Sequence, residues 1–287
     1  MKKFFLNIFY LLIIVLLFNI VVFVFSNDNY YKGYNEFPTK DFHSFILADS
    51  HGMPLDKFSE KFNVYNFSSN SDSYADMKRK ISYLIENEYA VKTIYITADD
   101  HTLSPYRDGI NNMDKSIIYT SKIDFNYIKE KYLKYYFPIF QLKVNGLFRI
   151  YVEDKIKLIL NQKEKTGNNI IWSELPQKEK NKRAEDRIAG QFPSEKRSEK
   201  LEKTLLEIVK LCRSNHIELI GLKFPVSRSY LEKLDSKNYG ADKLLESANL
   251  EVNDYKSIFQ QNDDYFRDQD HLNSEGGKEF VKVLLTK

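Results

Sequence analysis

The sequence has few of the residues that cross-link, kink or loosen a chain. Its 287 residues include 1 cysteine, 7 prolines and 10 glycines. The single cysteine, Cys212, excludes an intramolecular disulfide, and its place in an apolar helical pattern predicts a core residue. The low glycine and proline content also excludes collagen-like and low-complexity chains.

There is little excess of charge of either sign. The chain carries 43 Lys and Arg against 40 Asp and Glu, a formal net charge of +3. A strongly basic nucleic-acid binder would show a marked excess of Lys and Arg, so that class is excluded. With 43% hydrophobic residues, including 20 Tyr and 21 Phe, the chain can bury a large core. Its length predicts one large domain or two small ones.

One long hydrophobic run is present, at the N-terminus. Residues 4–25 are apolar except for Asn7 and Asn19, which is long enough to cross a hydrocarbon core of about 30 Å. Lys2 and Lys3 precede the run and favour a cytoplasmic N-terminus. A cleaved signal peptide is the main alternative, although no Ala-x-Ala site follows the run, and a buried core helix is a third. We expect a single-pass protein of the bacterial inner membrane with an extracytoplasmic, periplasmic domain.

The remaining chain alternates short apolar runs with helical patterns. We expect an anchor or signal segment at 1–26, a tether at 27–42, and one domain at 43–287 with a charged insertion or loop around 161–193. This alternation predicts an α/β fold, with a mainly parallel five-stranded sheet and helices on both faces. The expected strands are residues 44–48, 63–67, 93–97, 218–222 and 256–259. The expected helices are residues 54–62, 73–88, two within 124–160 broken near Pro138 and Gly146, 194–214, 227–234, 240–249 and 275–285.

Ligands of parallel sheets bind at the carboxyl ends of the strands. Ser50 follows the first strand in Ala-Asp-Ser-His-Gly, and Asp268 and His271 precede the last helix in Asp-Gln-Asp-His. A serine nucleophile requires a base, and the base requires an orienting acceptor. We therefore predict Ser50 as nucleophile, His271 as base and Asp268 as the group that orients it. Ordinary turn and surface roles are the alternative.

These motifs resemble the SGNH (GDSL-like) hydrolase superfamily, with its serine after the first strand and its Asp-x-x-His before the last helix. The resemblance spans residues 43–287, and Asp-x-x-His-Leu-Asn-x-x-Gly is its more specific part. With its N-terminal helix, the chain looks most like the alginate-acetylation and lipoteichoic-acid D-alanylation proteins. The resemblance implies a flavodoxin-like three-layer fold and a serine acyl-ester enzyme without a cofactor. It also implies an acylated cell-surface glycan or polymer as substrate, and transfer would need a membrane protein that supplies acyl groups.

The sequence departs from the family at the expected oxyanion hole. Ala48 replaces the first glycine of the serine motif, and residues 66–72 lack the glycine expected after the second strand. Asp99 stands where the family has an asparagine donor, and a carboxylate has no N–H and would repel an oxyanion. Three alternatives remain open: a protonated Asp99, a donor role for His101, or a hole built from backbone groups alone. The backbone candidates are Ser69, Asn70 and Ser71.

Three further polar residues lie near the strand ends. His51 could contact substrate or stabilise its turn, and His101 and Arg107 could bind acyl or sugar groups or form loop ion pairs. No group of residues has metal-ligand spacing, and no glycine-rich phosphate loop is present, so we expect no metal. The predicted activity is O-acetyl transfer or ester hydrolysis. The rival is a non-catalytic glycan-binding or scaffold module.

Overall fold

The computed structural model describes residues 1–34, 36–120, 125, 128–159 and 171–286. The chain forms two compact units, Met1–Phe37 with Asp114–Asn169, and Pro38–Met113 with Ile170–Lys287. The sequence predicts one continuous domain over 43–287, whereas the structure groups residues 114–169 with the N-terminal helix. The second unit therefore contains the sheet, and the first contains the hydrophobic run.

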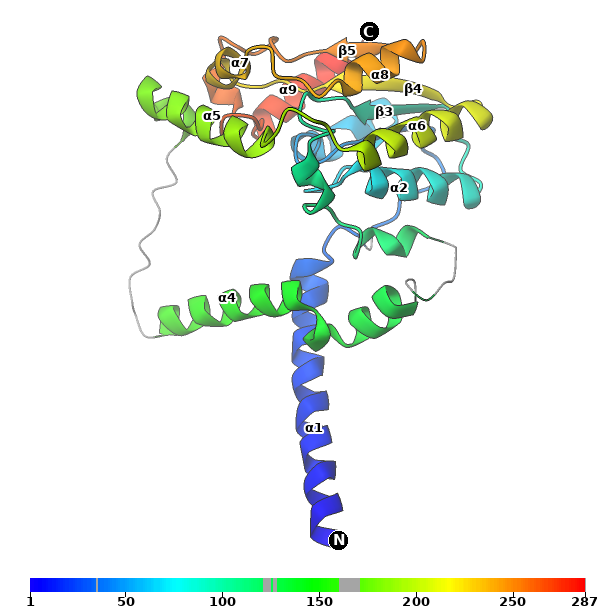
Figure 1. Cartoon of the computed structure of the whole chain (residues 1–287), viewed down its shortest axis with the longest axis vertical. Coiled ribbons are helices and arrows are strands. Elements are labelled where there is room, and N and C mark those ends of the chain that lie inside the picture. The colour runs from blue at the N-terminus through cyan, green and yellow to red at the C-terminus, as the bar shows by residue number, and fades with distance from the viewer. Residues whose placement is uncertain (35, 121–124, 126–127, 160–170, 287) are drawn as a thin grey trace. The chain divides into compact units, whose positions relative to one another are not determined.

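The second unit is built on a five-stranded sheet in which every neighbouring pair is parallel (Figure 1). The strand order is β2-β1-β3-β4-β5, a doubly wound order, and the predicted α/β class is confirmed. Because the winding reverses between β1 and β3, the ligand crevice of such a sheet opens there. The strands are β1 (Ser44–Leu47), β2 (Val64–Asn66), β3 (Thr93–Thr97), β4 (Glu218–Lys223) and β5 (Val252–Asp254).

Helices cover both faces of this sheet. On one face α2 packs against α6 and α6 against α8, and on the other α9 packs against the 3₁₀ segment η2. Gly221 of β4 lets α8 approach closely, since a Cβ there would lie 2.8 Å from Leu245 Cδ1. These helical elements are α2 (Tyr74–Glu86), α6 (Glu199–Ser214), α7 (Arg228–Leu234), α8 (Ala241–Ser247), α9 (Ser274–Leu285) and η2 (Met53–Phe62), with short 3₁₀ segments η3 (Pro105–Asp108), η7 (Trp172–Glu174) and η8 (Asp263–Tyr265).

Two expectations for the second unit are wrong. The fifth strand is Val252–Asp254 rather than 256–259, because residues 252–254 pair with β4 while residues 256–260 form a turn. Part of the expected charged loop is instead a helix, α5 (Gln177–Gln191). Ala184 and Ile188 give α5 a narrow apolar stripe that packs with Tyr230 of α7. Residues 161–170 of that expected loop lie outside the described part of the chain.

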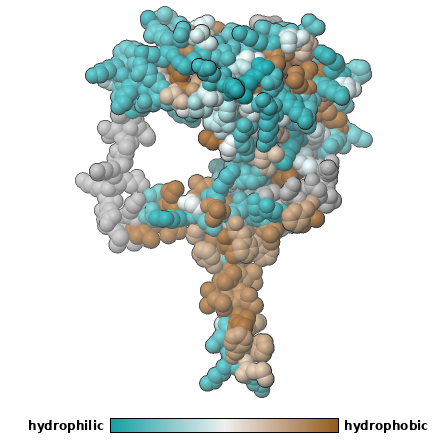
Figure 2. All heavy atoms as spheres, in the orientation of Figure 1, coloured by the Kyte–Doolittle hydropathy of each residue, from teal (hydrophilic) through white to brown (hydrophobic). Residues whose placement is uncertain are grey.

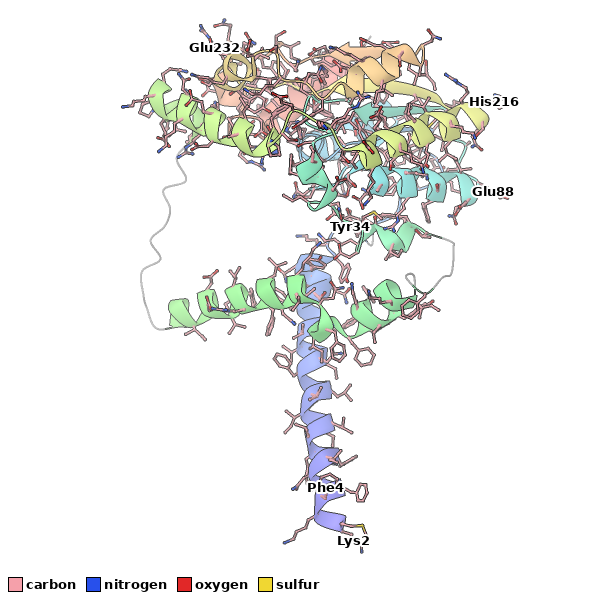
Figure 3. The ribbon with its side chains drawn as sticks, viewed as in Figure 1. Lys2, Phe4, Tyr34, Glu88, His216 and Glu232 are labelled. Atoms are coloured by element: carbon pink, nitrogen blue, oxygen red, sulfur yellow. The ribbon has the colours of Figure 1, made fainter. Side chains whose placement is uncertain are left out.

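The first unit contains α1 (Lys2–Phe25), which continues as one π-helical turn, η1 (Ser26–Tyr30). By length and composition α1 could cross a membrane, and Figures 2 and 3 show its apolar surface and Lys2 and Phe4 at its free end. The expected break at Pro138 is confirmed, but Gly146 lies inside a helix, where glycine costs only about 1 kcal/mol. The other elements are η4 (Ser116–Tyr119), η5 (Ile128–Lys134), η6 (Pro138–Phe140) and α4 (Leu142–Ile159).

Candidate active site

Ser50 lies in a tight turn directly after β1, at the carboxyl edge of the sheet. Asp49 shapes this turn, because its Oδ1 accepts from the His51 N–H at 3.0 Å and its carbonyl accepts from the Gly52 N–H at 3.2 Å. A Cβ at Gly52 would lie 2.3 Å from Ser68 Oγ, so only glycine fits there without movement. Ser50 is half-buried.

The structure brings Ser50, His271 and Asp268 into one line of hydrogen bonds. His271 Nε2 lies 2.8 Å from Ser50 Oγ, and His271 Nδ1 lies 2.8 Å from Asp268 Oδ1. The same Asp268 oxygen also accepts from the His271 backbone N–H at 2.9 Å, which fixes the loop that carries the ring. This is the arrangement that activates a serine hydroxyl for attack on a carbonyl carbon.

A second carboxylate, Asp270, also faces the His271 ring. Its Oδ1 lies 3.2 Å from His271 Nδ1, while its Oδ2 accepts from Arg187 Nε at 2.7 Å and from Gln191 Nε2 at 2.9 Å. Asp270 is buried. Sequence analysis missed Asp270, Arg187 and Gln191. The adjacency of Asp270 to His271 was a usable signal, whereas the α5 residues looked like an ordinary charged loop.

The two carboxylates change the titration of His271. Burial lowers the pKa of His271, but the hydrogen bonds to Asp268 and Asp270 outweigh it and leave the pKa raised. Burial raises the pKa of Asp268, and the hydrogen bond to His271 outweighs it and lowers that pKa. An imidazolium formed at His271 is therefore stabilised, as a base that takes the serine proton requires.

Asp99, the residue that departs from the family pattern, is paired with His51. Its Oδ2 lies 2.7 Å from His51 Nδ1, and its Oδ1 accepts from the Phe224 N–H at 2.7 Å. The other ring nitrogen of His51 lies 3.4 Å from Asp270 Oδ2. Burial lowers the pKa of His51, but the charge of Asp99 and the contact with Asp270 raise it well above its usual value. With a carboxylate at each nitrogen, the protonated form of His51 is stabilised.

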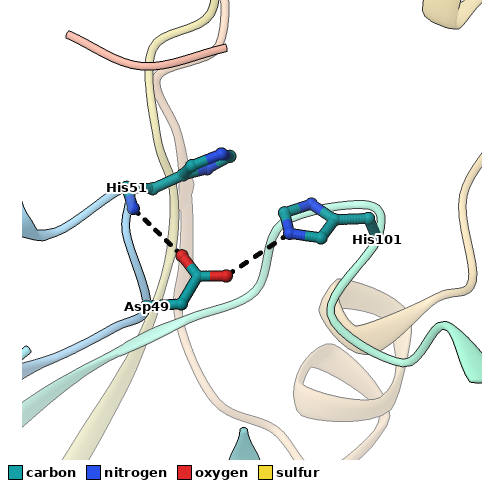
Figure 4. A group of neighbouring side chains, drawn as sticks. All are labelled: Asp49, His51 and His101. Carbon is teal, nitrogen blue, oxygen red and sulfur yellow. Dashed lines mark hydrogen bonds and ion pairs between the residues drawn. The ribbon is translucent and has the colours of Figure 1, made fainter. Parts of the chain in front are cut away.

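His101 and Arg107 lie inside the protein and share Asp49 as partner, as Figure 4 shows for Asp49, His51 and His101. Asp49 Oδ2 lies 3.1 Å from Arg107 Nη2 and 3.4 Å from His101 Nε2. Burial raises the pKa of Asp49, yet the Arg107 guanidinium holds it well below its usual range, and burial lowers the pKa of His101. In this conformation both residues form internal contacts with Asp49.

Two groups of buried side chains have donor atoms close enough for a metal ion, within 4.8 Å of one another: Asp49 with His51 and His101, and His51 with Asp270 and His271. Their donors are already paired with one another or with Arg107 and Arg187. In each group a metal ion would have to compete with one guanidinium of the same sign of charge, that of Arg107 in the first group and that of Arg187 in the second. These residues therefore do not fit a resident metal.

The loop after β2 lies against the Ser50 turn. The Ala48 N–H donates to Ser68 Oγ at 3.1 Å, and the Ser69 N–H donates to the Ala48 carbonyl at 3.2 Å. Of the three backbone candidates for the oxyanion hole, Ser69 is thus excluded, because its N–H is already hydrogen-bonded to Ala48. Asn70 and Ser71 remain, and their N–H groups have no partner within the described part of the chain.

The conformation of this loop does not require the missing glycine. Ser71 adopts φ +67°, the left-handed region that glycine favours, so a serine takes the backbone shape at some cost in strain. The buried Lys80 supports the loop from below, where its ammonium donates to the Phe67 carbonyl and to Asp72 Oδ2 at 2.6 Å each. The loop is thus held in place by Lys80 although residues 66–72 contain no glycine.

No family model matches the chain, and no curated protein matches it. Among solved structures, it is similar to a crystal structure of a protein from Bacteroides fragilis that has been proposed to be an acylhydrolase. The identity is 11%, the alignment covers 90% of this chain and 95% of that one, and the TM-score is 0.38. A similarity of this size supports neither an activity nor a substrate here.

Proposed function

We propose that the chain is a serine-dependent acyl-ester enzyme that acts outside the cytoplasm on acylated cell-surface polysaccharide. One observation carries the proposal: Ser50, His271 and Asp268 form a continuous pair of 2.8 Å hydrogen bonds at the carboxyl edge of a parallel sheet. Such a sheet binds ligands at that edge, between strands where the winding reverses. A surface histidine with a structural role would not require both contacts.

In the first step Ser50 Oγ attacks the carbonyl carbon of the ester while His271 Nε2 takes its proton. Asp268 holds the ring and balances the charge of the imidazolium. The negative charge that develops on the carbonyl oxygen is stabilised by the backbone N–H of Ser50 and by that of Asn70 or Ser71. The tetrahedral intermediate then expels the alcohol, which receives the proton from His271, and an acyl-enzyme remains on Ser50.

In the second step an acceptor hydroxyl replaces the alcohol. His271 takes the proton of this hydroxyl as it attacks the acyl carbon, and returns a proton to Ser50 Oγ when the acyl bond breaks. Water as acceptor makes the protein an esterase, and a sugar hydroxyl makes it an O-acetyl transferase. Transfer would require a membrane partner that supplies acyl groups, because acetyl donors of the cytoplasm do not reach the extracytoplasmic side of the membrane.

The test uses the full-length protein in detergent with a fluorophosphonate probe and 4-nitrophenyl acetate. We expect covalent labelling of Ser50, and a loss of ester cleavage of at least about 10³-fold in Ser50→Ala and in His271→Ala. Ser194→Ala is a matched control, because Ser194 is an exposed serine of the same unit. Acetylated oligosaccharides, offered with and without free acceptor, then distinguish transfer from hydrolysis.

An unlabelled Ser50 with equal activity in wild type and Ser50→Ala would reject the enzyme. Retained binding of acetylated oligosaccharide in that case would favour a glycan-binding module.

A further inference from the structure

The first unit exposes far more apolar surface than the second. Between residues 128 and 156, eleven large apolar side chains are 42–88% exposed. The described residues of the second unit, a much longer stretch of chain, expose only seven, and these are scattered. Soluble surfaces rarely gather apolar side chains in this way unless something covers them. Six of the eleven are Leu133, Tyr136, Phe140, Leu142, Leu147 and Ile150.

The elements that carry these side chains pack around the C-terminal part of α1. Phe148 of α4 contacts Phe18 and Phe25, at ring-centroid distances of 5.9 and 5.2 Å. The Asn19 side chain, a polar group within the hydrophobic run, donates to the Tyr136 carbonyl at 2.9 Å. We call residues 128–156, which include η5, η6 and most of α4, the collar. In Figure 1 α4 runs across α1 rather than along it.

The length of α1 determines where the collar lies relative to a bilayer that α1 spans. Residues 4–18 are exposed, and at 1.5 Å per residue they span about 22 Å, less than the hydrocarbon core of about 30 Å. Hydrocarbon must therefore reach approximately the level of Phe23. At that level the collar already contacts α1, since Phe23 packs on Tyr135 and Tyr136 at 5.5 and 6.0 Å. A membrane that α1 spans brings the collar to its surface.

One face of α4 continues from the protein interior into this exposed region. Val144, Leu147 and Tyr151 follow one another at spacings of three and four residues and share a face. Val144 is fully buried in a cluster with Val22, whereas Leu147 and Tyr151 are 43% and 44% exposed. Glu153 lies on another face, paired with Arg149 at 2.7 Å. The apolar face thus extends beyond the part that α1 covers.

The composition of the collar suits a lipid headgroup region. Residues 128–156 carry six Lys and Arg against three Asp and Glu, together with five tyrosine and phenylalanine side chains among the eleven exposed ones. Aromatic rings concentrate at membrane interfaces, and clustered cations attract anionic lipids. Helices with an apolar and a basic face lie in the interface plane.

We propose that the collar, residues 128–156, lies in the headgroup region of the bilayer that α1 spans and binds anionic lipid there. The occupant of its apolar face is lipid, because that face is continuous with the lipid-facing surface of α1. The inference is independent of the proposed activity. It gives the protein a two-part membrane attachment, one helix that crosses and one segment that rests on the surface.

The test places an environment-sensitive dye at single cysteines in the full-length chain. Cys212 is buried and burial raises its pKa to about 12, so an alkylating dye reacts with the introduced cysteine alone. Leu147→Cys and Phe140→Cys carry the probe in the collar, and Glu153→Cys, on another face of the same helix, is the matched control. The chain is reconstituted in phosphatidylcholine vesicles, with or without phosphatidylglycerol, that contain headgroup-level nitroxide lipids.

We expect blue-shifted emission and several-fold stronger nitroxide quenching at positions 147 and 140 than at 153, increased further by phosphatidylglycerol. Equal, water-like emission and weak quenching at all three positions would overturn the proposal. The proposal would also be overturned if the cysteines at positions 147 and 140 were protected from alkylation in native membranes but not in pure lipid vesicles. That result would assign the apolar face to a protein partner. Circular dichroism of each variant verifies that the helices are intact.

Discussion

His51 Nδ1 and Asp99 Oδ2 lie 2.7 Å apart in a buried contact beside the candidate nucleophile, which gives the unusual carboxylate after the third strand a structural role. The Asp99 carboxylate, which would repel an oxyanion, instead lies against the imidazole of His51, the residue directly after Ser50. Thr97 Oγ1 donates to the same oxygen at 3.1 Å, and the Phe224 N–H donates to the other. Asp99 thus acts as an acceptor in every contact that is found for it.

This arrangement makes a prediction opposite to the one from family resemblance. Asp99→Asn restores the family's residue, but it replaces an acceptor by an N–H₂ group and removes the charge that balances His51. A charge-assisted hydrogen bond is worth about 1.5–3 kcal/mol, so we expect ester cleavage to fall roughly 10- to 100-fold. The measurement is kcat/KM with 4-nitrophenyl acetate. Asp254→Asn, a half-exposed carboxylate at the end of β5, is the control. Increased activity in Asp99→Asn would show that position 99 serves the oxyanion hole.

Replacement of Asp268 and replacement of Asp270 should have different effects on the pH dependence of ester cleavage. His271 must be unprotonated to act as a base, so the rate rises with pH through its pKa, which both carboxylates raise. Asp270→Asn removes one of them and should shift the rising limb to lower pH with a modest loss of rate. Asp268→Asn also loses the 2.8 Å contact that orients the ring, and we expect a fall in kcat of about 10³–10⁴-fold at every pH.

The control for this pair is Asp264→Asn, an exposed carboxylate in the same loop that should leave the profile unchanged. Thermal melts of each variant exclude unfolding as the cause. If Asp270→Asn costs as much rate as Asp268→Asn, Asp270 is the orienting group instead.

The parts of this site that lie next to regular elements could be predicted from sequence. Ser50 directly follows a short apolar run, and Asp268 and His271 directly precede an amphipathic helix, so the sheet topology alone brings them to one edge. The partner of Asp99 could not be predicted, because His51 lies 48 residues away and only the folded turn aims its ring at β3. Helix α5 was missed because only two of its buried residues, Ala184 and Ile188, are apolar, while Lys180 and Gln191, also buried, are polar.

Arg107 should contribute to stability rather than only to substrate binding. Arg107→Gln leaves the buried Asp49 carboxylate without its guanidinium, and loss of one partner of a buried pair costs about 3–5 kcal/mol. The pKa of Asp49 is lowered in the folded protein, so this carboxylate contributes to the free energy of unfolding at pH values above the pKa of an unfolded aspartate, about 3.9. The contribution is lost as the pH falls through the folded pKa. The readout is the melting temperature in detergent between neutral and acid pH.

The matched control for Arg107 is Arg183→Gln, which breaks an exposed pair with Glu179 and should cost less than about 1 kcal/mol. A melting temperature for Arg107→Gln equal to that of the control, together with a raised KM for acetylated oligosaccharide, would instead assign Arg107 to substrate binding.

Replacement of Gly52 by alanine should disturb the turn that carries the candidate nucleophile. In Gly52→Ala the new Cβ would lie 2.3 Å from Ser68 Oγ and 2.8 Å from Ala48 Cβ, so either the turn that carries Ser50 or the Ser68 side chain must shift. Overpacking of this kind costs about 1–3 kcal/mol, and we expect the Ser50–His271 contact to lengthen and kcat to fall by 10-fold or more, roughly the rate equivalent of that energy.

Two further variants test this cause. Ser68→Gly in the Gly52→Ala background removes the nearest atoms and should recover part of the lost rate. Gly190→Ala in α5 meets no atom within 4 Å, and it should be neutral or stabilise the helix by up to about 1 kcal/mol. If Gly52→Ala retains full kcat while Gly190→Ala behaves as expected, the turn has room to adjust, and close packing against Ser68 does not hold Ser50 in place.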